Sequence, residues 1–230
     1  MKLKFWQLFL NGLQAIRITR EDSNTSFKMN NIQLIKSLKE EGFSKDIINA
    51  FSKVRREEFL QDHMKPRAYE DTALSIGEGQ TISQPYTIAK MLEMLSLKKG
   101  QKVLEVGSGC GYVLALISNI IGTKGNIYGI EIVKSLADKS RINLSEYANI
   151  KVYHGNGKDG LIEKILFDRI IISAALEEIP EKLIGQLKEG GIIVAPIGSQ
   201  YEQTLTSFQK VNGKLEMREE FPGFIFVPFV

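Results

Sequence analysis

The chain has 230 residues with 43% hydrophobic and 25% charged side chains, which is the ordinary composition of a soluble globular protein. Its formal net charge of +3, without a block of Lys or Arg, argues against a nucleic-acid-binding protein. Two histidines are too few for the usual histidine metal site, and a single cysteine excludes a disulfide within the chain. No apolar run approaches the ~18 residues of a membrane span. We therefore expect a cytoplasmic protein of one domain with no metal and no nucleic-acid or membrane partner.

Residues 1–28 precede the first helical pattern. Lys2 and Lys4 lie before an apolar patch over Phe5–Leu10. The patch is shorter than the apolar region of a secretory signal peptide, and no convincing small-residue cleavage site follows it. An amphipathic extension, a partner-binding arm and a disordered leader all remain open for this stretch.

Residues 29–96 are expected to form a helical segment ahead of a sheet. Apolar positions with helical spacing predict a first helix over 32–41, ended by Gly42. Ser44 is a favourable N-cap for a second helix that extends through Phe51.

The rest of this segment contains a charged run, a turn-rich stretch and a third helix. Arg55–Glu58 is typical of a solvated surface because all four of its residues are charged. Residues 69–80 are rich in turn-forming residues. Pro85 suits the first turn of a helix that should extend to about Leu95.

From Gln101 onward, strand patterns alternate with helix patterns. This alternation predicts an α/β fold with a doubly wound, mostly parallel sheet and right-handed crossovers. Near-continuous apolar strands indicate that both faces of the sheet are covered. Asn212-Gly213 predicts the turn of a C-terminal antiparallel hairpin. The expected strands are 101–106, 126–131, 150–154, 167–173, 191–196, 204–211 and 214–230, and the expected helices are 113–121, 133–147 and one beginning near Pro180.

A glycine-rich turn follows the first of these strands. Gly107, Gly109 and Gly111 stand at alternate positions between the strand and the next helix. Glycine permits positive φ and close approach of a ligand, and the helix start offers free N–H groups to polar or anionic groups. The G-x-G-x-G spacing differs from the G-x-G-x-x-G dinucleotide fingerprint. A purely structural tight turn is the alternative interpretation.

An acid ends the second strand of the sheet. Glu131 lies roughly 20 residues past the glycines, where an acid binds a ribose diol in nucleotide-binding folds. The alternative is a solvated residue at the start of the helix over 133–147. The glycine turn and the acid together favour a nucleotide-type cofactor site.

The glycine turn, the acid and the C-terminal hairpin together resemble the S-adenosylmethionine-dependent methyltransferases of the Rossmann-like class. Within that class, Asp71–Pro85 (DTALSIGEGQTISQP) is similar to the signature of the protein-L-isoaspartate O-methyltransferases. The resemblance runs from about residue 30 to the end of the chain. It implies one methyltransferase domain over 29–230, with the cofactor-binding sheet over 97–230. Further similar segments are Lys53–Phe59, Gln186–Gly191 and Pro196–Gly198.

The resemblance implies methyl transfer from S-adenosylmethionine to the free α-carboxylate of L-isoaspartyl residues in damaged proteins and peptides. It places Ser83 at the acceptor, although Ser is equally a favoured helix N-cap. A carboxylate with an ordinary pKa near 4 is ionised at neutral pH and needs no general base. The residues implied around the cofactor are Thr81, Ile82, Glu105, Gly107, Ser108, Gly109, Gly111, Glu131, Ile132, Asn156, Gly157 and Gln203.

Three positions depart from the family pattern. Gln84 stands where alanine is common, Tyr86 where histidine is common, and Asn156 where an aspartate normally contacts the adenine amino group. Asn156 still offers a carbonyl acceptor, but without charge. These changes leave open a homologue that binds the cofactor but has lost turnover or altered its acceptor.

Two other functions deserve comparison with this one. An NAD-dependent oxidoreductase is disfavoured by the G-x-G-x-G spacing. A methyltransferase with an amino acceptor is disfavoured because Ser173–Leu176 follows the fourth strand, where such enzymes often carry an Asn/Asp-Pro-Pro-Tyr element. The expected partners are isoaspartyl proteins and peptides, and the expected state is a monomer.

Overall fold

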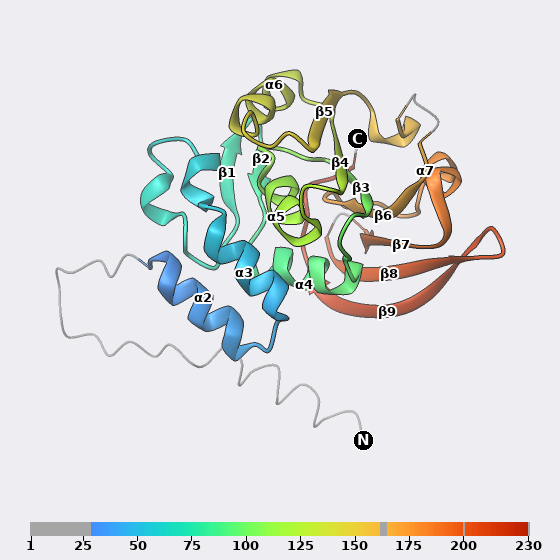
Figure 1. Cartoon of the computed structure of the whole chain (residues 1–230), viewed down its shortest axis with the longest axis horizontal. Helices are drawn as coiled ribbons and strands as arrows, with labels where there is room; N and C mark the ends of the chain where they lie inside the picture. The colour runs from blue at the N-terminus through green and yellow to red at the C-terminus, as the bar shows by residue number, and fades with distance from the viewer. Residues whose placement is uncertain (1–28, 162–164, 200, 230) are drawn as a thin grey trace.

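The structure is a computed structural model that describes residues 29–161, 165–199 and 201–229 (Figure 1). It confirms the predicted α/β class. A seven-stranded sheet has the order β5-β4-β3-β6-β7-β8-β9, and Figure 1 shows β5 at one end and β9 at the other. The extension predicted over residues 1–28 lies outside the described part of the chain. The parallel strands are β3 (Lys102–Val106), β4 (Asn126–Glu131), β5 (Ile150–His154), β6 (Phe167–Ile172) and β7 (Leu187–Gly198).

The antiparallel hairpin is also confirmed. β8 (Gln203–Val211) and β9 (Lys214–Phe224) are joined by Asn212 and Gly213, whose φ values of 51° and 78° suit a two-residue hairpin turn. The strand predicted to continue to residue 230 ends at Phe224. Beyond Phe224 the chain crosses the end of β6, and residues 225–229 are called the crossing segment below.

Two backbone hydrogen bonds fix this crossing segment. The Ala175 N–H donates to the Val227 carbonyl at 2.8 Å, and the Phe229 N–H donates to the Ala175 carbonyl at 2.8 Å. This pairing outside the main sheet is the reason that the C-terminal strand pattern does not extend β9. It brings residues 227–229 over the carboxyl edge of the parallel strands.

Alternating residues of the parallel strands enter two apolar layers. Val103 and Ile127 pack into the layer formed with the larger helices, whereas Leu104 and Ile170 pack into the opposite layer with Leu183. Both faces of the sheet are therefore covered, as the apolar strands predicted. The first layer contains α2 (Asn31–Glu40), α3 (Lys45–Lys53), α4 (Pro85–Leu95), α5 (Tyr112–Ile121) and α6 (Lys134–Asn143), and the second contains α7 (Glu181–Gln186).

A small antiparallel hairpin was not predicted from the sequence. β1 (Leu74–Gly77) and β2 (Gln80–Ile82) lie in the turn-rich stretch. Glu78 at their tip has φ +56°, between two glycines of positive φ. Strands of four and three residues are too short to show alternation. The predicted helix over 133–147 and the strand start at 191 were also inaccurate, since α6 ends at Asn143 and β7 begins at Leu187.

The charged run at the start of the 3₁₀ helix η1 (Arg56–Phe59) is only partly solvated. Arg56 has an exposed fraction of 0%, which contradicts the predicted surface position. Its guanidinium carbon lies 5.3 Å from the Tyr112 ring centroid, and its Nη2 donates to the Thr72 carbonyl at 3.3 Å. A cation–π contact to a buried aromatic ring explains why this one charge turns inward. A second 3₁₀ helix, η2 (Lys65–Arg67), follows.

Candidate active site

The glycine turn between β3 and α5 needs glycine at each of its three positions. Gly107, Gly109 and Gly111 have φ values of +80°, +49° and +89°, where a side chain is strained. A Cβ on Gly111 would also lie 2.6 Å from the Ser140 hydroxyl. The amides of Gly107 and Ser108 donate to the Ile130 carbonyl at 2.9 and 3.1 Å, which fixes the turn against the end of β4.

Glu131 is part of the same unit. Its side chain is 5% exposed, which rules out the solvated position that was the alternative interpretation. Oε2 accepts a hydrogen bond from the Gly109 amide at 2.7 Å, and Oε1 accepts one from the Val133 amide at 2.9 Å. Each carboxylate oxygen retains a further lone pair that can accept a hydrogen bond from a ligand.

Glu105 on β3 is buried more deeply, at 1% exposed. Ser173 Oγ donates to Glu105 Oε1 at 2.8 Å, whereas Glu105 Oε2 is buried and has no hydrogen-bond partner within the described residues. Burial raises the pKa of Glu105 to about 8, against the hydrogen bond from Ser173 and with the help of the nearby acid Glu131. A buried acceptor without a partner at this edge is suited to a cationic hydrogen-bond donor of a ligand.

Two small adjoining cavities are lined by these groups. One, of about 60 Å³, lies between the glycine turn, Glu131, Ile132, Gly157 and the crossing segment. The other, of about 40 Å³, is lined by Ile82, Ser83, Glu105, Ser108 and Cys110, among others. Thr81 and Ser173 line both. Thus the structure brings together Thr81, Ile82, Ser83, Glu105, Gly107, Ser108, Gly109, Glu131, Ile132 and Gly157.

A larger groove of about 720 Å³ opens beside these cavities. One wall comes from Asp71–Ala73 and Ser83–Thr87, apart from the buried Pro85, and the other from Phe221–Val227. Thr81 and Ser173 line this groove too. The groove therefore meets the carboxyl edge of the sheet at Thr81 and Ser173, the residues that it shares with both smaller cavities.

Ser83 is not the N-cap of α4. The cap position is Gln84, which makes no side-chain cap bond. Asp71 takes over this role, because its carboxylate accepts from the Tyr86 amide at 2.8 Å and from Gln84 Nε2 at 2.9 Å. Among the described residues none hydrogen-bonds to the Ser83 hydroxyl, which stays available to a ligand in the groove. Gln84 and Tyr86, two of the positions that depart from the family pattern, thus line the groove, and both are hydrogen-bonded to Asp71.

Three of the expected cofactor residues lie outside the two small cavities. Gly111 packs so close to Ser140 of α6 that a Cβ would not fit there, so its role is to let the turn approach α6. Asn156 Oδ1 accepts from the Lys158 amide at 2.9 Å, caps the 3₁₀ helix η3 (Gly157–Asp159), and lines a separate cavity next to Gly157. Gln203 is buried, and its Oε1 accepts from the Phe226 amide at 2.7 Å. It holds the crossing segment in place.

Gly157 lines the cavity of about 60 Å³ between Val106 and Phe229. A Cβ there would lie 2.2 Å from Val106 Cγ1 and 3.2 Å from Phe229 Cε2. The crossing segment therefore packs directly on this glycine, and only the missing side chain leaves room for it.

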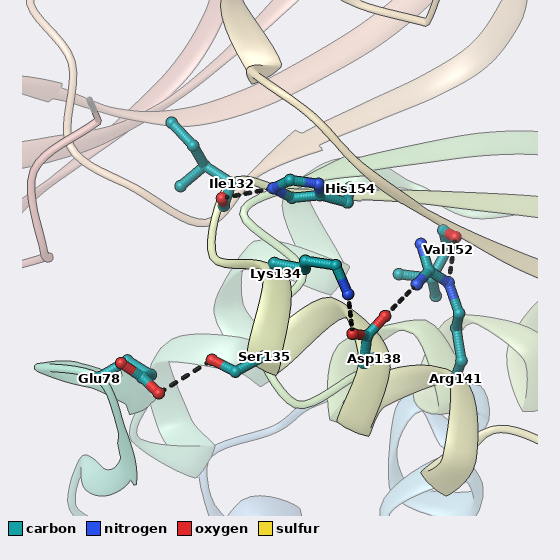
Figure 2. A network of polar contacts seen from close by, with 8 residues as sticks. All are labelled: Glu78, Ile132, Lys134, Ser135, Asp138, Arg141, Val152 and His154. Atoms are coloured by element: carbon teal, nitrogen blue, oxygen red, sulfur yellow. Dashed lines mark hydrogen bonds and ion pairs between the residues drawn. The ribbon is translucent and has the colours of Figure 1, made fainter.

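Polar contacts join the β1–β2 hairpin and β5 to the start of α6 (Figure 2). Ser135 Oγ donates to Glu78 Oε1 at 2.9 Å, which ties the hairpin tip to α6. Figure 2 shows the His154 ring pointing at the Ile132 carbonyl, with Nε2 3.2 Å from the oxygen. These contacts hold the loop that follows Glu131 from both sides.

Ser173 and the crossing segment were missed as site residues. Ser173 ends the β6 run, and the residue that follows a parallel strand lies at the ligand-binding edge, so its position could have identified it. The crossing segment gave no such signal, because its apolar residues were assigned to β9.

A metal-binding cluster and a membrane-spanning helix each set requirements on the side chains and helices of the described ranges. No group of three His, Cys, Asp or Glu side chains there is arranged to hold a metal ion. No helix of those ranges has the length and apolar character to cross a membrane.

The family model for protein-L-isoaspartate(D-aspartate) O-methyltransferase matches residues 29–230. The chain belongs to this family. The match confirms the family that the sequence resembles, and it begins two residues before α2. Members of the family use S-adenosylmethionine.

Two curated relatives cover most of the chain. A protein-L-isoaspartate O-methyltransferase of Methanothrix thermoacetophila is 41% identical over 200 residues, which cover 86% of this chain and 93% of that protein. One of Fervidobacterium nodosum is 42% identical over 197 residues, which cover 85% of this chain and 98% of that protein.

Two solved structures of similar proteins superpose on most of this chain. One protein-L-isoaspartate O-methyltransferase superposes with a TM-score of 0.80 at 30% identity, and the match covers 86% of this chain and 65% of that chain. A putative family member from Plasmodium falciparum, solved in complex with S-adenosyl-L-homocysteine, has a TM-score of 0.77 at 28% identity. That match covers 88% of this chain and 99% of the other.

The residues present fit S-adenosylmethionine as the cofactor of the family. The glycine turn leaves space for close approach, and the unpartnered Glu105 oxygen suits a cationic end of the ligand. A small-molecule pocket commonly measures about 300–1,000 Å³. The two cavities are smaller than this, and they adjoin the groove of about 720 Å³ at Thr81 and Ser173.

Proposed function

We propose that this chain transfers a methyl group from S-adenosylmethionine to the free α-carboxylate of L-isoaspartyl residues in damaged proteins and peptides. The observation that carries the proposal is the junction at Thr81 and Ser173, where the open groove meets the two cofactor cavities. Ser83 faces both the groove and the cavity beside Glu105. An acceptor group held in the groove would therefore reach the cofactor edge next to this hydroxyl.

The cofactor supplies an electrophilic methyl group on a sulfonium. An ionised acceptor carboxylate requires no general base, which is consistent with a site that contains no histidine among its lining residues. The work of the protein is to orient the acceptor and to exclude water. The hydroxyls of Ser83 and Thr81 can hydrogen-bond a carboxylate without adding charge. A neutral donor suits the reaction because transfer removes an anion and a cation together, so strong charge pairing would stabilise the reactants.

The carboxyl edge of the sheet would hold the cofactor by three groups. Glu105 would accept a hydrogen bond from the α-amino group, and Glu131 would accept from the ribose hydroxyls. Asn156 and Gly157 would lie beside the adenine, where the amide carbonyl of Asn156 replaces the family carboxylate. These roles are supported by the burial of the two acids and by their position on either side of the glycine turn.

The test is methyl transfer to paired peptides that differ only in carrying isoaspartate or ordinary aspartate at one position. We expect methylation of the isoaspartyl peptide alone. Binding of S-adenosylhomocysteine without methylation of either peptide would overturn the proposal in favour of a cofactor-binding homologue. Equal methylation of both peptides would overturn the acceptor specificity.

We further propose that the enzyme acts as a cytoplasmic monomer on protein and peptide substrates. The low net charge of +3 supports the absence of a nucleic-acid partner. Size-exclusion chromatography with light scattering tests the first point, since a dimer mass would contradict it.

A further inference from the structure

Glu105 is an acid whose surroundings do not support a negative charge. It accepts one hydrogen bond, from Ser173, and its second oxygen is buried without a partner in the described chain. The side chain lines the cavity of about 40 Å³ and is 1% exposed. A buried carboxylate with one neutral donor is costly unless a cation or further donors reach it.

The groups that face Glu105 from neighbouring elements add no cation. Glu131 at the end of β4 is itself an acid and disfavours a second negative charge. Cys110 and Tyr112 of the glycine turn line the same cavity, and burial raises the pKa of Cys110 to about 11. Arg56 lies behind them, but no ion pair joins it, or another basic residue of the described ranges, to Glu105.

The hairpin side of the cavity is neutral as well. Thr81, Ile82 and Ser83 complete the lining there. Neither the Thr81 nor the Ser83 hydroxyl bonds to Glu105 in this structure. The charge that would stabilise an ionised Glu105 must therefore come from a ligand.

We propose that Glu105 carries a proton in the ligand-free enzyme and releases it to solvent when the cationic α-amino end of the cofactor binds. The balance is simple: a neutral carboxyl group and an ammonium become a carboxylate–ammonium pair and one free proton. The inference rests on cofactor binding and is independent of which acceptor is methylated.

The direction in which cofactor affinity changes with pH follows from the burial of Glu105. Because burial raises the pKa of Glu105 to about 8, most of the ligand-free molecules carry this proton near pH 7. An ammonium within hydrogen-bond distance favours the carboxylate and lowers the pKa again. Cofactor binding must then tighten as pH rises, by up to about tenfold per unit, and level off above about pH 8.

Isothermal titration calorimetry with S-adenosylhomocysteine measures the released proton directly. This ligand keeps the α-amino group and lacks the sulfonium, so it isolates the charge in question. Titrations near pH 7 in buffers of different ionisation enthalpy should show release of most of one proton per ligand bound, and the number should fall towards zero well above the pKa of Glu105. Heats that do not depend on the buffer would overturn the proposal.

Two variants and a second ligand test whether the released proton comes from Glu105. Glu105→Gln should bind without proton release, and 5′-methylthioadenosine, which lacks the amino-acid end, should release none from the wild type. Glu78→Gln, which removes an exposed acid at the tip of the β1–β2 hairpin, should retain the release. Unchanged release in Glu105→Gln, or equal release with 5′-methylthioadenosine, would assign the proton elsewhere and overturn the proposal. If the glutamine variant does not fold, the pH series and the second ligand on the wild-type enzyme still decide it.

Discussion

The Gly109 amide donates a 2.7 Å hydrogen bond to Glu131 Oε2, across 22 positions of sequence. The glycine turn after β3 and the acid after β4 are therefore joined before a ligand arrives. This contact joins the turn, whose three glycines have left-handed φ values, to the end of β4. It also means that Glu131 supports both the cofactor and the turn, so substitutions there must be interpreted with stability data.

Replacing Glu131 should weaken cofactor binding. Glu131→Ala loses charged hydrogen bonds of roughly 1.5–3 kcal/mol, or about ten- to a hundredfold in affinity for S-adenosylhomocysteine. Its melting temperature should fall as well, because the amides of Gly109 and Val133 lose their acceptor. Glu131→Gln keeps an acceptor oxygen and should separate the two effects. Unchanged affinity of the alanine variant by calorimetry would remove Glu131 from the binding site.

Ser83 should affect turnover more than cofactor binding. A hydroxyl that orients the acceptor carboxylate contributes mainly in the transition state, so Ser83→Ala should lower kcat for isoaspartyl peptide by roughly tenfold or more. Affinity for S-adenosylhomocysteine should stay within about threefold. Because the hydroxyl does not cap α4, the melting temperature should not change.

Gln84→Ala is the matched control for Ser83. It removes the neighbouring side chain that bonds Asp71, and should lower stability with a smaller effect on kcat. Wild-type turnover in Ser83→Ala would end the proposal that its hydroxyl orients the acceptor.

Asn156→Asp should tighten cofactor binding modestly. A carboxylate accepts the adenine amino proton more strongly than an amide carbonyl does. The substitution keeps the oxygen that caps η3 through Lys158, so the melting temperature should hold. Peptide selectivity should also be unchanged in the paired methylation assay. Weaker binding in the variant would show that this loop does not contact the adenine.

Glu105 should make the ligand-free enzyme less stable as pH rises. Its pKa is raised from 4.5 to about 8, so its contribution to stability is complete below about pH 4.5 and is lost progressively up to about pH 8. Relative to Glu105→Gln, the wild-type melting temperature should fall by at least about 4 °C between pH 5 and 8. Scanning fluorimetry measures both curves, with Glu78→Gln as an exposed control that keeps the wild-type slope. Parallel curves for Glu105→Gln and the wild type would contradict this prediction.

The sheet and the cofactor edge could be predicted from the sequence because their signals are local. Apolar runs, three glycines and an acid at the end of a strand each reflect the backbone at one place. The signature around Ser83 was likewise contiguous. These elements occur in the structure with boundaries shifted by a few residues.

The remaining features depend on contacts between distant segments. Arg56 turned inward because Tyr112, 56 positions later, offers a buried ring. Residues 227–229 left the hairpin because Ala175 offered backbone partners. Gln203 lies under the Phe226 amide and supports that segment, although it was expected beside the ligand. Patterns of composition and spacing carry no information about such pairings.

Cys110, the only cysteine of the chain, lies buried in the glycine turn with its pKa raised to about 11. A thiol that is both covered and protonated reacts with an alkylating reagent only during moments when the turn opens. The rate of alkylation therefore measures how often the glycine turn opens locally. The measurement needs no added label, and no second thiol of the chain competes for the reagent.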